Sequence, residues 1–163
     1  MGTGSAYPSP HRGASGLILR NTASGVQWLF DCGEGTQIQV QKFPEAKVSR
    51  VTRIFISHLH GDHVFGLPGF LATMGARAAK GETADTYNHG SVDVEIYGPQ
   101  GLRRFLRLAL SLSCCDSSAL RHLLHIVSPE DPTLDTLVHE ATMHSSLEES
   151  AYEKGHTTAA GAA

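Results

Sequence analysis

The chain has 163 residues, of which 40% are hydrophobic and 18% are charged, a balance typical of a globular domain. This composition excludes disordered, collagen-like and coiled-coil chains. Thirteen Lys and Arg residues against sixteen Asp and Glu residues give a net charge of −3, so no overall positive field attracts nucleic acid. A chain of this length buries roughly 70% of its unfolded surface, which predicts a single domain.

The cysteines and the apolar segments bear on the cellular environment. Three cysteines, two of them adjacent at Cys114 and Cys115, form no disulfide framework and indicate a reducing, intracellular compartment. We expect the protein to be located in the cytoplasm or the nucleus, and an organelle is the alternative. Apolar stretches such as Leu106 to Leu112 are far shorter than the roughly 20 residues of a membrane span, so no membrane partner is expected.

The hydrophobic pattern predicts short strands that alternate with helices. In chain order we expect strands at 16–20 and 26–30 around a turn, a helix at 36–42, a strand at 51–56, a helix at 67–74, a strand at 92–97, an amphipathic helix beginning at Pro99, strands at 123–127 and 136–139, and a helix at 147–154. This alternation predicts an α/β fold.

The segment after the strand at 51–56 carries the strongest chemical signal. His58, His60, Asp62 and His63 place three imidazoles and a carboxylate within six positions. Both donor types suit zinc. While the backbone stays extended, His58 and His60 point to the same side, and Gly61 then permits a turn that brings Asp62 and His63 back. A lone histidine is usually structural, but this spacing predicts a metal site.

At this cluster the sequence resembles the metallo-β-lactamase superfamily, whose signature is His-x-His-x-Asp-His at the end of a strand. Further segments resemble ribonuclease Z, the tRNA 3′-end-processing endonuclease, in its short form. They are residues 1–15, 28–37, 58–63, 65–69, 97–102, 139–142 and 155–157. The His-Glu-Ala-Thr element at 139–142 and the His-Thr element at 156–157 separate this family from lactamases and glyoxalases.

The resemblance implies a partial αββα metallo-β-lactamase sandwich, with residues 1–163 as a single incomplete domain. Compared with the family, the middle segment is missing near residue 133 and the end is missing after residue 163. The missing parts would supply an RNA-gripping arm, two zinc-binding histidines and an Asp that bridges two metals. With four donors left for the two zinc ions of the complete family, we expect fewer or more weakly bound ions here.

The resemblance also implies a function and its residues. Precursor tRNA would be hydrolysed by a metal-activated water, and the complete protein would be a homodimer. The implied metal ligands are His58, His60, Asp62 and His63. Asp62 would also orient or deprotonate the water, while Glu140 and His156 would relay a proton to the leaving group. No RNA-binding residue is assigned.

Two residues beside the expected ligands are predicted to position neighbouring groups rather than to take part in the reaction. Asp31 follows a strand close to the metal loop, so it either orients a ligand imidazole or shapes a turn. His139 is expected to position its loop by hydrogen bonding, with metal ligation as the alternative.

Two other functions stay open. The metal cluster alone is compatible with another hydrolase of the superfamily, acting on an ester, a thioester or a lactam, although the element at 139–142 argues against it. A chain that lacks ligands can also be a non-catalytic variant that dimerises with a complete copy. We therefore expect this shortened chain to be impaired or inactive alone.

Overall fold

The structure, a computed structural model, describes residues 1–80, 92–113 and 120–126. For residue 92 and residues 120–126 only the backbone is described. Its strands are β1 (Leu17–Arg20), β2 (Gln27–Phe30), β3 (Val51–Phe55), β4 (Val92–Gly98) and β5 (Leu120–Ile126). Its helices are α1 (Thr36–Val40), α2 (Gly61–Val64), α3 (Leu67–Ala79) and α4 (Leu102–Leu112), with a 3-10 turn at Val48–Arg50. None of these helices has the length and apolarity needed to cross a lipid bilayer.

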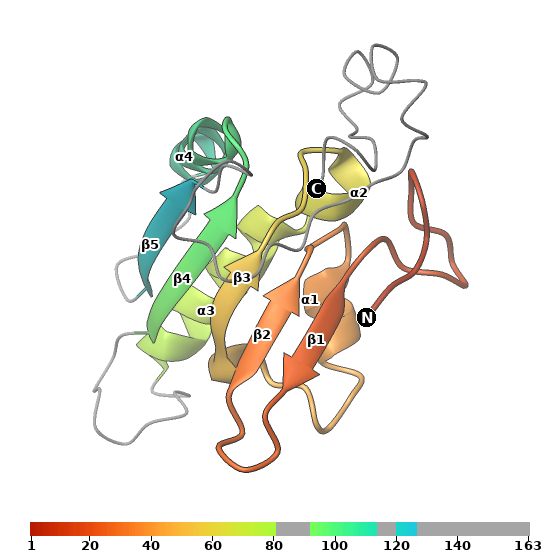
Figure 1. The fold of residues 1–163 in the computed structure, drawn as a ribbon, viewed down its shortest axis with the longest axis vertical. Coiled ribbons are helices and arrows are strands. Elements are labelled where there is room, and N and C mark those ends of the chain that lie inside the picture. The colour runs from red at the N-terminus through yellow and green to blue at the C-terminus, as the bar shows by residue number, and fades with distance from the viewer. Residues whose placement is uncertain (81–91, 114–119, 127–163) are drawn as a thin grey trace, which may run out of the picture.

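The five strands form one sheet in the order β1-β2-β3-β4-β5 (Figure 1). β1 and β2 are an antiparallel hairpin. Its turn is built by Asn21, whose Oδ1 accepts the amides of Ala23 and Ser24, and by Gly25, whose φ of 74° suits glycine. β2, β3, β4 and β5 are parallel, so their carboxyl ends share one edge of the sheet.

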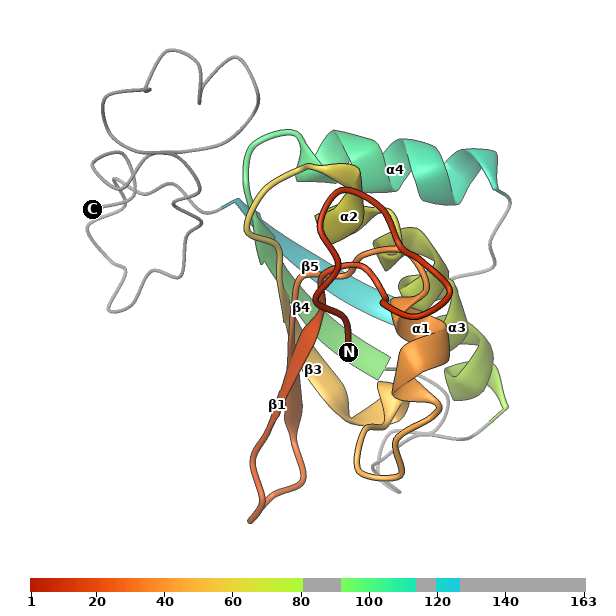
Figure 2. The ribbon, with the colours of Figure 1, turned by 90° about the vertical axis from the view of Figure 1, so that its right-hand side faces the viewer.

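The connecting helices α1, α3 and α4 lie on the same face of the sheet (Figure 2). Strand side chains alternate, so Leu29 on β2 and Ile54 on β3 face these helices and are fully buried. The core includes Leu29, Val40, Ile54, Phe70, Leu71, Met74, Ile96, Leu102 and Leu106. Burial of each such side chain contributes about 1.5–3 kcal/mol, which fixes the helices against the sheet.

The opposite face of the sheet carries aromatic rings. Phe55 stacks on Phe30 and on Tyr97, with ring centroids 4.9 and 5.0 Å apart, and Trp28 meets Phe55 edge-on. No helix or strand of the described segments covers this face, so they form one helical layer and one sheet layer of the expected sandwich. The α/β fold class predicted from the sequence is confirmed.

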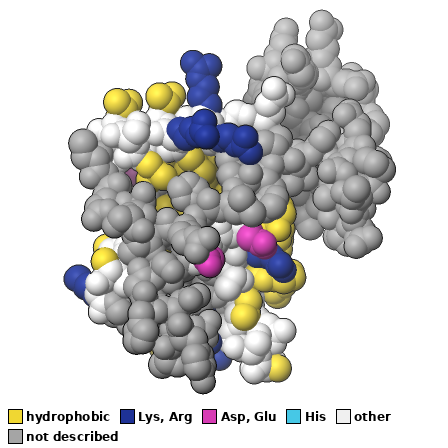
Figure 3. Space-filling view, turned by 90° about the vertical axis from the view of Figure 1, so that its left-hand side faces the viewer, with side chains coloured by type: hydrophobic (Ala, Val, Ile, Leu, Met, Phe, Trp, Pro, Cys, Tyr) yellow, Lys and Arg dark blue, Asp and Glu magenta, His cyan; other side chains and the backbone are white. Residues whose placement is uncertain are grey.

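α4 confirms the expected amphipathic surface helix. Leu102 and Leu106 are buried, whereas Arg103, Arg104 and Arg107 are exposed. In Figure 3 several Lys and Arg side chains gather at the top of the view, the end of the molecule where Figure 1 draws α4. The helix begins at Leu102 rather than at Pro99, because Gly101 at its N-terminal boundary adopts a φ of 100° that interrupts helical geometry.

Other elements also differ from expectation, and α1 ends at Val40 rather than at residue 42. α3 continues to Ala79 instead of ending near Met74, because the alanines that follow Gly75 favour a helix and Ala78 is buried. β5 begins at Leu120, three residues early. The expected loop after His58 contains a short helix, α2. The strand predicted at 136–139 and the helix at 147–154 lie outside the described residues.

Candidate metal centre

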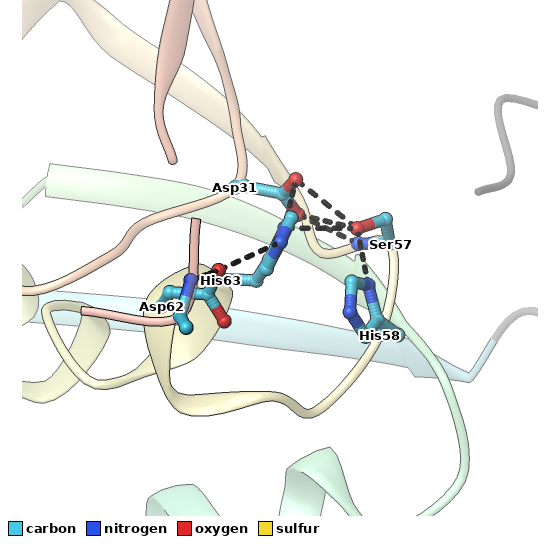
Figure 4. A network of polar contacts seen from close by, with 6 residues as sticks. Asp31, Ser57, His58, Asp62 and His63 are labelled. Carbon is cyan, nitrogen blue, oxygen red and sulfur yellow. Dashed lines mark hydrogen bonds and ion pairs between the residues drawn. The ribbon is translucent and has the colours of Figure 1, made fainter. Parts of the chain in front are cut away.

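The predicted ligand cluster lies at the edge of the sheet where β3 ends. The backbone is extended at His60, and α2 then begins at Gly61. The rings of His58 and His60 are 4.8 Å apart and those of His58 and His63 are 4.1 Å apart, measured between centroids. Asp62 and His58 are buried, with 8% and 7% of their surface exposed. The four side chains therefore gather in one place. Figure 4 labels three of them, His58, Asp62 and His63, together with Asp31 and Ser57.

Asp31 comes from the end of the neighbouring strand β2 and reaches this cluster. Its Oδ2 lies 2.7 Å from Nδ1 of His63, and its Oδ1 accepts the amide of Ser57 at 2.9 Å (Figure 4). An ionised carboxylate only accepts hydrogen bonds, so Nδ1 of His63 carries the proton. Nε2 of His63 is then the nitrogen with the lone pair, as a metal ligand requires.

The ionised state of Asp31 follows from its surroundings. Burial alone would raise the pKa of this carboxyl group, but hydrogen bonds from His63 and Ser57 outweigh burial and leave the pKa below its ordinary value. Asp31 is therefore negatively charged at neutral pH. Its charge stabilises the Nδ1-protonated form of the neighbouring imidazole.

Ser57 connects Asp31 to a second imidazole, a role that was not predicted from the sequence. Its hydroxyl donates to Asp31 Oδ1 at 2.8 Å and lies 3.0 Å from Nδ1 of His58. A hydroxyl has one proton, so if Asp31 receives it, Nδ1 of His58 must donate to Ser57. Nε2 of His58 then bears the lone pair. One carboxylate thus sets the tautomer of two imidazoles, directly for His63 and through Ser57 for His58.

Asp62 stands in the first turn of α2. Its Oδ2 accepts the backbone amide of Ala6 at 2.7 Å and lies 3.5 Å from Nε2 of His63. The N-terminal segment therefore touches the cluster directly. This contact joins residues 56 positions apart and was not expected from the sequence.

Close backbone packing holds α2 in place. The amide of Cys32 donates to His63 O at 2.7 Å, and the amide of Gly66 donates to Cys32 O at 2.9 Å. A Cβ atom at Gly33 would lie 2.1 Å from Asp62 O, and one at Gly66 would lie 2.0 Å from Gly33 O. Only glycine fits at these two positions.

Cys32 lies next to Asp31 but takes no part in the cluster. The thiol is free and fully buried, and burial raises its pKa far above the ordinary range. It therefore stays a neutral thiol and packs as a small apolar side chain.

The donor chemistry of the cluster fits zinc, because imidazoles whose Nε2 atoms bear the lone pair lie beside a buried carboxylate. Within the segments 1–80, 92–113 and 120–126, however, no three His, Cys, Asp or Glu side chains are arranged to hold a single ion. Glu140, His156 and His139 lie outside the described residues.

Sequence comparison finds relatives with the expected names. Residues 1–95 match the family model described as Anti-Pycsar protein Apyc1. The chain is 52% identical to zinc phosphodiesterase ELAC protein 1 of Bos taurus over 113 residues, 69% of this chain and 28% of that protein. It is 45% identical to ribonuclease Z of Prochlorococcus marinus (strain MIT 9312) over 126 residues, 77% of this chain and 36% of that protein. The chain thus spans well under half the length of these relatives.

Comparison with solved structures finds relatives of the same family. The crystal structure of human tRNase Z, short form (ELAC1), matches with a TM-score of 0.66 and 30% identity over 98% of this chain and 83% of that chain. The metallo-β-lactamase fold protein YhfI from Bacillus subtilis matches with a TM-score of 0.54 at 17% identity, which shows a shared fold. The chain therefore belongs to the ribonuclease Z family of metallo-β-lactamase fold proteins, and its residues 1–95 also fall within the family described as Anti-Pycsar protein Apyc1.

Proposed function

We propose that this chain is a zinc-dependent endoribonuclease of the tRNA 3′-trailer-processing type, which cleaves a phosphodiester of precursor tRNA by hydrolysis. The names of its relatives support the proposal, since they include a zinc phosphodiesterase and a tRNase Z. The observation that supports it most is the arrangement of Asp31 and Ser57, whose contacts with Nδ1 of His63 and Nδ1 of His58 leave Nε2 of each ring with the lone pair that a metal ion would need.

In this proposal His58 and His60 hold one ion, and Asp62 and His63 hold the other. Zinc, when bound, supplies a coordinated water with a pKa of about 7 and a Lewis acid for the phosphoryl oxygen. Asp62, already beside His63, orients the attacking water and accepts its proton. Glu140 and His156 pass a proton to the departing 3′ oxygen, and His139 positions its loop.

The ligand number sets the expected strength of binding. Zinc sites in proteins take three or four protein ligands, whereas this proposal gives each ion two from the cluster. We therefore propose that the four cluster residues by themselves bind zinc weakly and support slow cleavage. We also propose that the protein forms a homodimer. An intracellular location, in the cytoplasm or the nucleus, belongs to the same proposal because Cys32 is a free thiol.

The experiment supplies purified protein with zinc and a precursor tRNA and maps the new 3′ end. Parallel reactions contain an ester, a thioester and a lactam. We expect cleavage after the acceptor stem that His58→Ala abolishes and that His11→Ala, a change at an exposed histidine, leaves intact. Turnover of an ester, thioester or lactam without RNA cleavage would contradict the proposal and favour another hydrolase of the superfamily.

A further inference from the structure

The N-terminal segment makes an unusual contact with the buried carboxylate of Asp62. Ser5, Ala6 and Tyr7 are exposed, yet the amide of Ala6 donates to Asp62 Oδ2 at 2.7 Å. The Asp62 side chain is only 8% exposed. An exposed stretch therefore reaches inward through one backbone N–H group.

The backbone at Ala6 is held in a conformation that alanine rarely adopts. Its φ is 66°, in the left-handed region, and the amide of Tyr7 donates to Ser5 O at 2.8 Å to close a three-residue turn around it. The segment is tied down further along, because the amide of Gly4 donates to Gly13 O at 2.8 Å. Such an outlier persists only where its surroundings impose it.

The hydrogen bond has a defined effect on the carboxylate. It fixes the plane of Asp62 and engages one direction on Oδ2, beside Nε2 of His63 at 3.5 Å. A group that orients a ligand in this way changes metal affinity, and loss of such a partner typically weakens metal binding about 10–100-fold. Ala6 contributes through its backbone, so the side chain itself is not involved.

We propose that the Ala6 amide is a positioning group for Asp62, and that the strained turn at residues 5–7 sets how tightly the cluster binds zinc. This inference rests on the proposed role of Asp62 as a zinc ligand. It assigns part of the zinc affinity to the N-terminal segment, which contacts the cluster without supplying a ligand.

The test changes the backbone preference of Ala6 without removing a buried contact. Glycine accepts a positive φ freely, whereas the β-branched valine resists it. We expect the zinc dissociation constant, measured by chelator competition, to rise about 10-fold in Ala6→Val and to be unchanged or lower in Ala6→Gly. Ala23→Val, at an exposed turn on the β1–β2 hairpin, is the matched control and should bind zinc as the original chain does.

A second measurement needs no zinc. In the metal-free protein, hydrogen exchange at the Ala6 amide should be slow, and Asp62→Ala should accelerate it at least about 10-fold. Equal zinc affinity in Ala6→Val, Ala6→Gly and the original chain would overturn the proposal, as would an unprotected Ala6 amide. Absence of His58-dependent zinc binding in the original chain would instead overturn the proposed function, and this inference with it.

Discussion

Asp31 and His63 stand 32 residues apart in the chain and are joined by a 2.7 Å hydrogen bond between Oδ2 and Nδ1. The bond is possible because β2 and β3 are adjacent and parallel, so both residues follow strands that end at the same edge. The amide of Asp31 donates to Phe55 O at 2.8 Å and secures this junction. Sites in parallel sheets commonly form outside the carboxyl ends of the strands.

Replacing Asp31 tests whether this bond orients His63. Asp31→Asn keeps the shape but loses the charge and places an amide near the Nδ1 proton of His63. We expect zinc affinity to fall about 10–100-fold in chelator competition. Glu34→Gln removes a carboxylate from an exposed residue of the same loop and should leave the affinity unchanged. Equal affinities for both variants would contradict an orienting role for Asp31.

Ser57 allows a test of the hydroxyl alone. Ser57→Ala removes the link between Asp31 and Nδ1 of His58 but keeps the backbone bond from the residue 57 amide to Asp31. We expect the nitrogen chemical shifts of His58 to show a mixture of tautomers in the alanine variant and a single Nδ1-protonated form in Ser57→Thr, which retains a hydroxyl. A single tautomer in both variants would show that something other than the hydroxyl fixes His58.

The glycine contacts behind α2 predict a steric effect. Gly33→Ala would drive a Cβ atom into Asp62 O, and Gly66→Ala would drive one into Gly33 O. Overpacking of this kind costs typically about 1–3 kcal/mol, which urea denaturation measures. Gly13→Ala is the control, because its added Cβ would find its nearest neighbour at an ordinary 3.5 Å. If Gly33→Ala matched this control in stability, the close packing behind α2 would be refuted.

The buried thiol predicts slow chemical modification. Because burial raises the pKa of Cys32, the thiol stays protonated and shielded at pH 8, where reactive cysteines ionise. In a C114S/C115S variant, Ellman's reagent should react with Cys32 only as fast as the protein opens, and promptly in urea. Immediate reaction of the native variant would mean that Cys32 is accessible.

The sequence predicted the parts of the fold that depend on local pattern. Alternating side chains predicted β4, and the turn at residues 22–25 between two short apolar segments predicted the β1–β2 hairpin. The helix boundaries were less accurate. The helix predicted at 67–74 was too short, because burial of Ala78 outweighs the helix-breaking tendency of Gly75 and α3 continues to Ala79.

The candidate site was predictable in part for the same reason. The four expected ligands are neighbours in sequence, so their spacing alone marked them. Ser57 and Ala6 were missed, because their roles depend on which strands pair and on where the N-terminal segment lies. Asp31 was noticed, but only the parallel register of β2 and β3 decides between an orienting residue and a turn residue.

The parallel pairing of β2 with β3 also constrains the order of folding. An antiparallel hairpin such as β1–β2 can zip from its own turn, whereas β2 and β3 must first close the loop that contains α1. A nascent chain that has emerged only to Phe55 has the carboxylate of Asp31 but none of the imidazoles that follow β3. The orientation of His63 by Asp31 therefore arises only after the two strands have paired in register, and an intermediate without that register is expected to bind zinc more weakly.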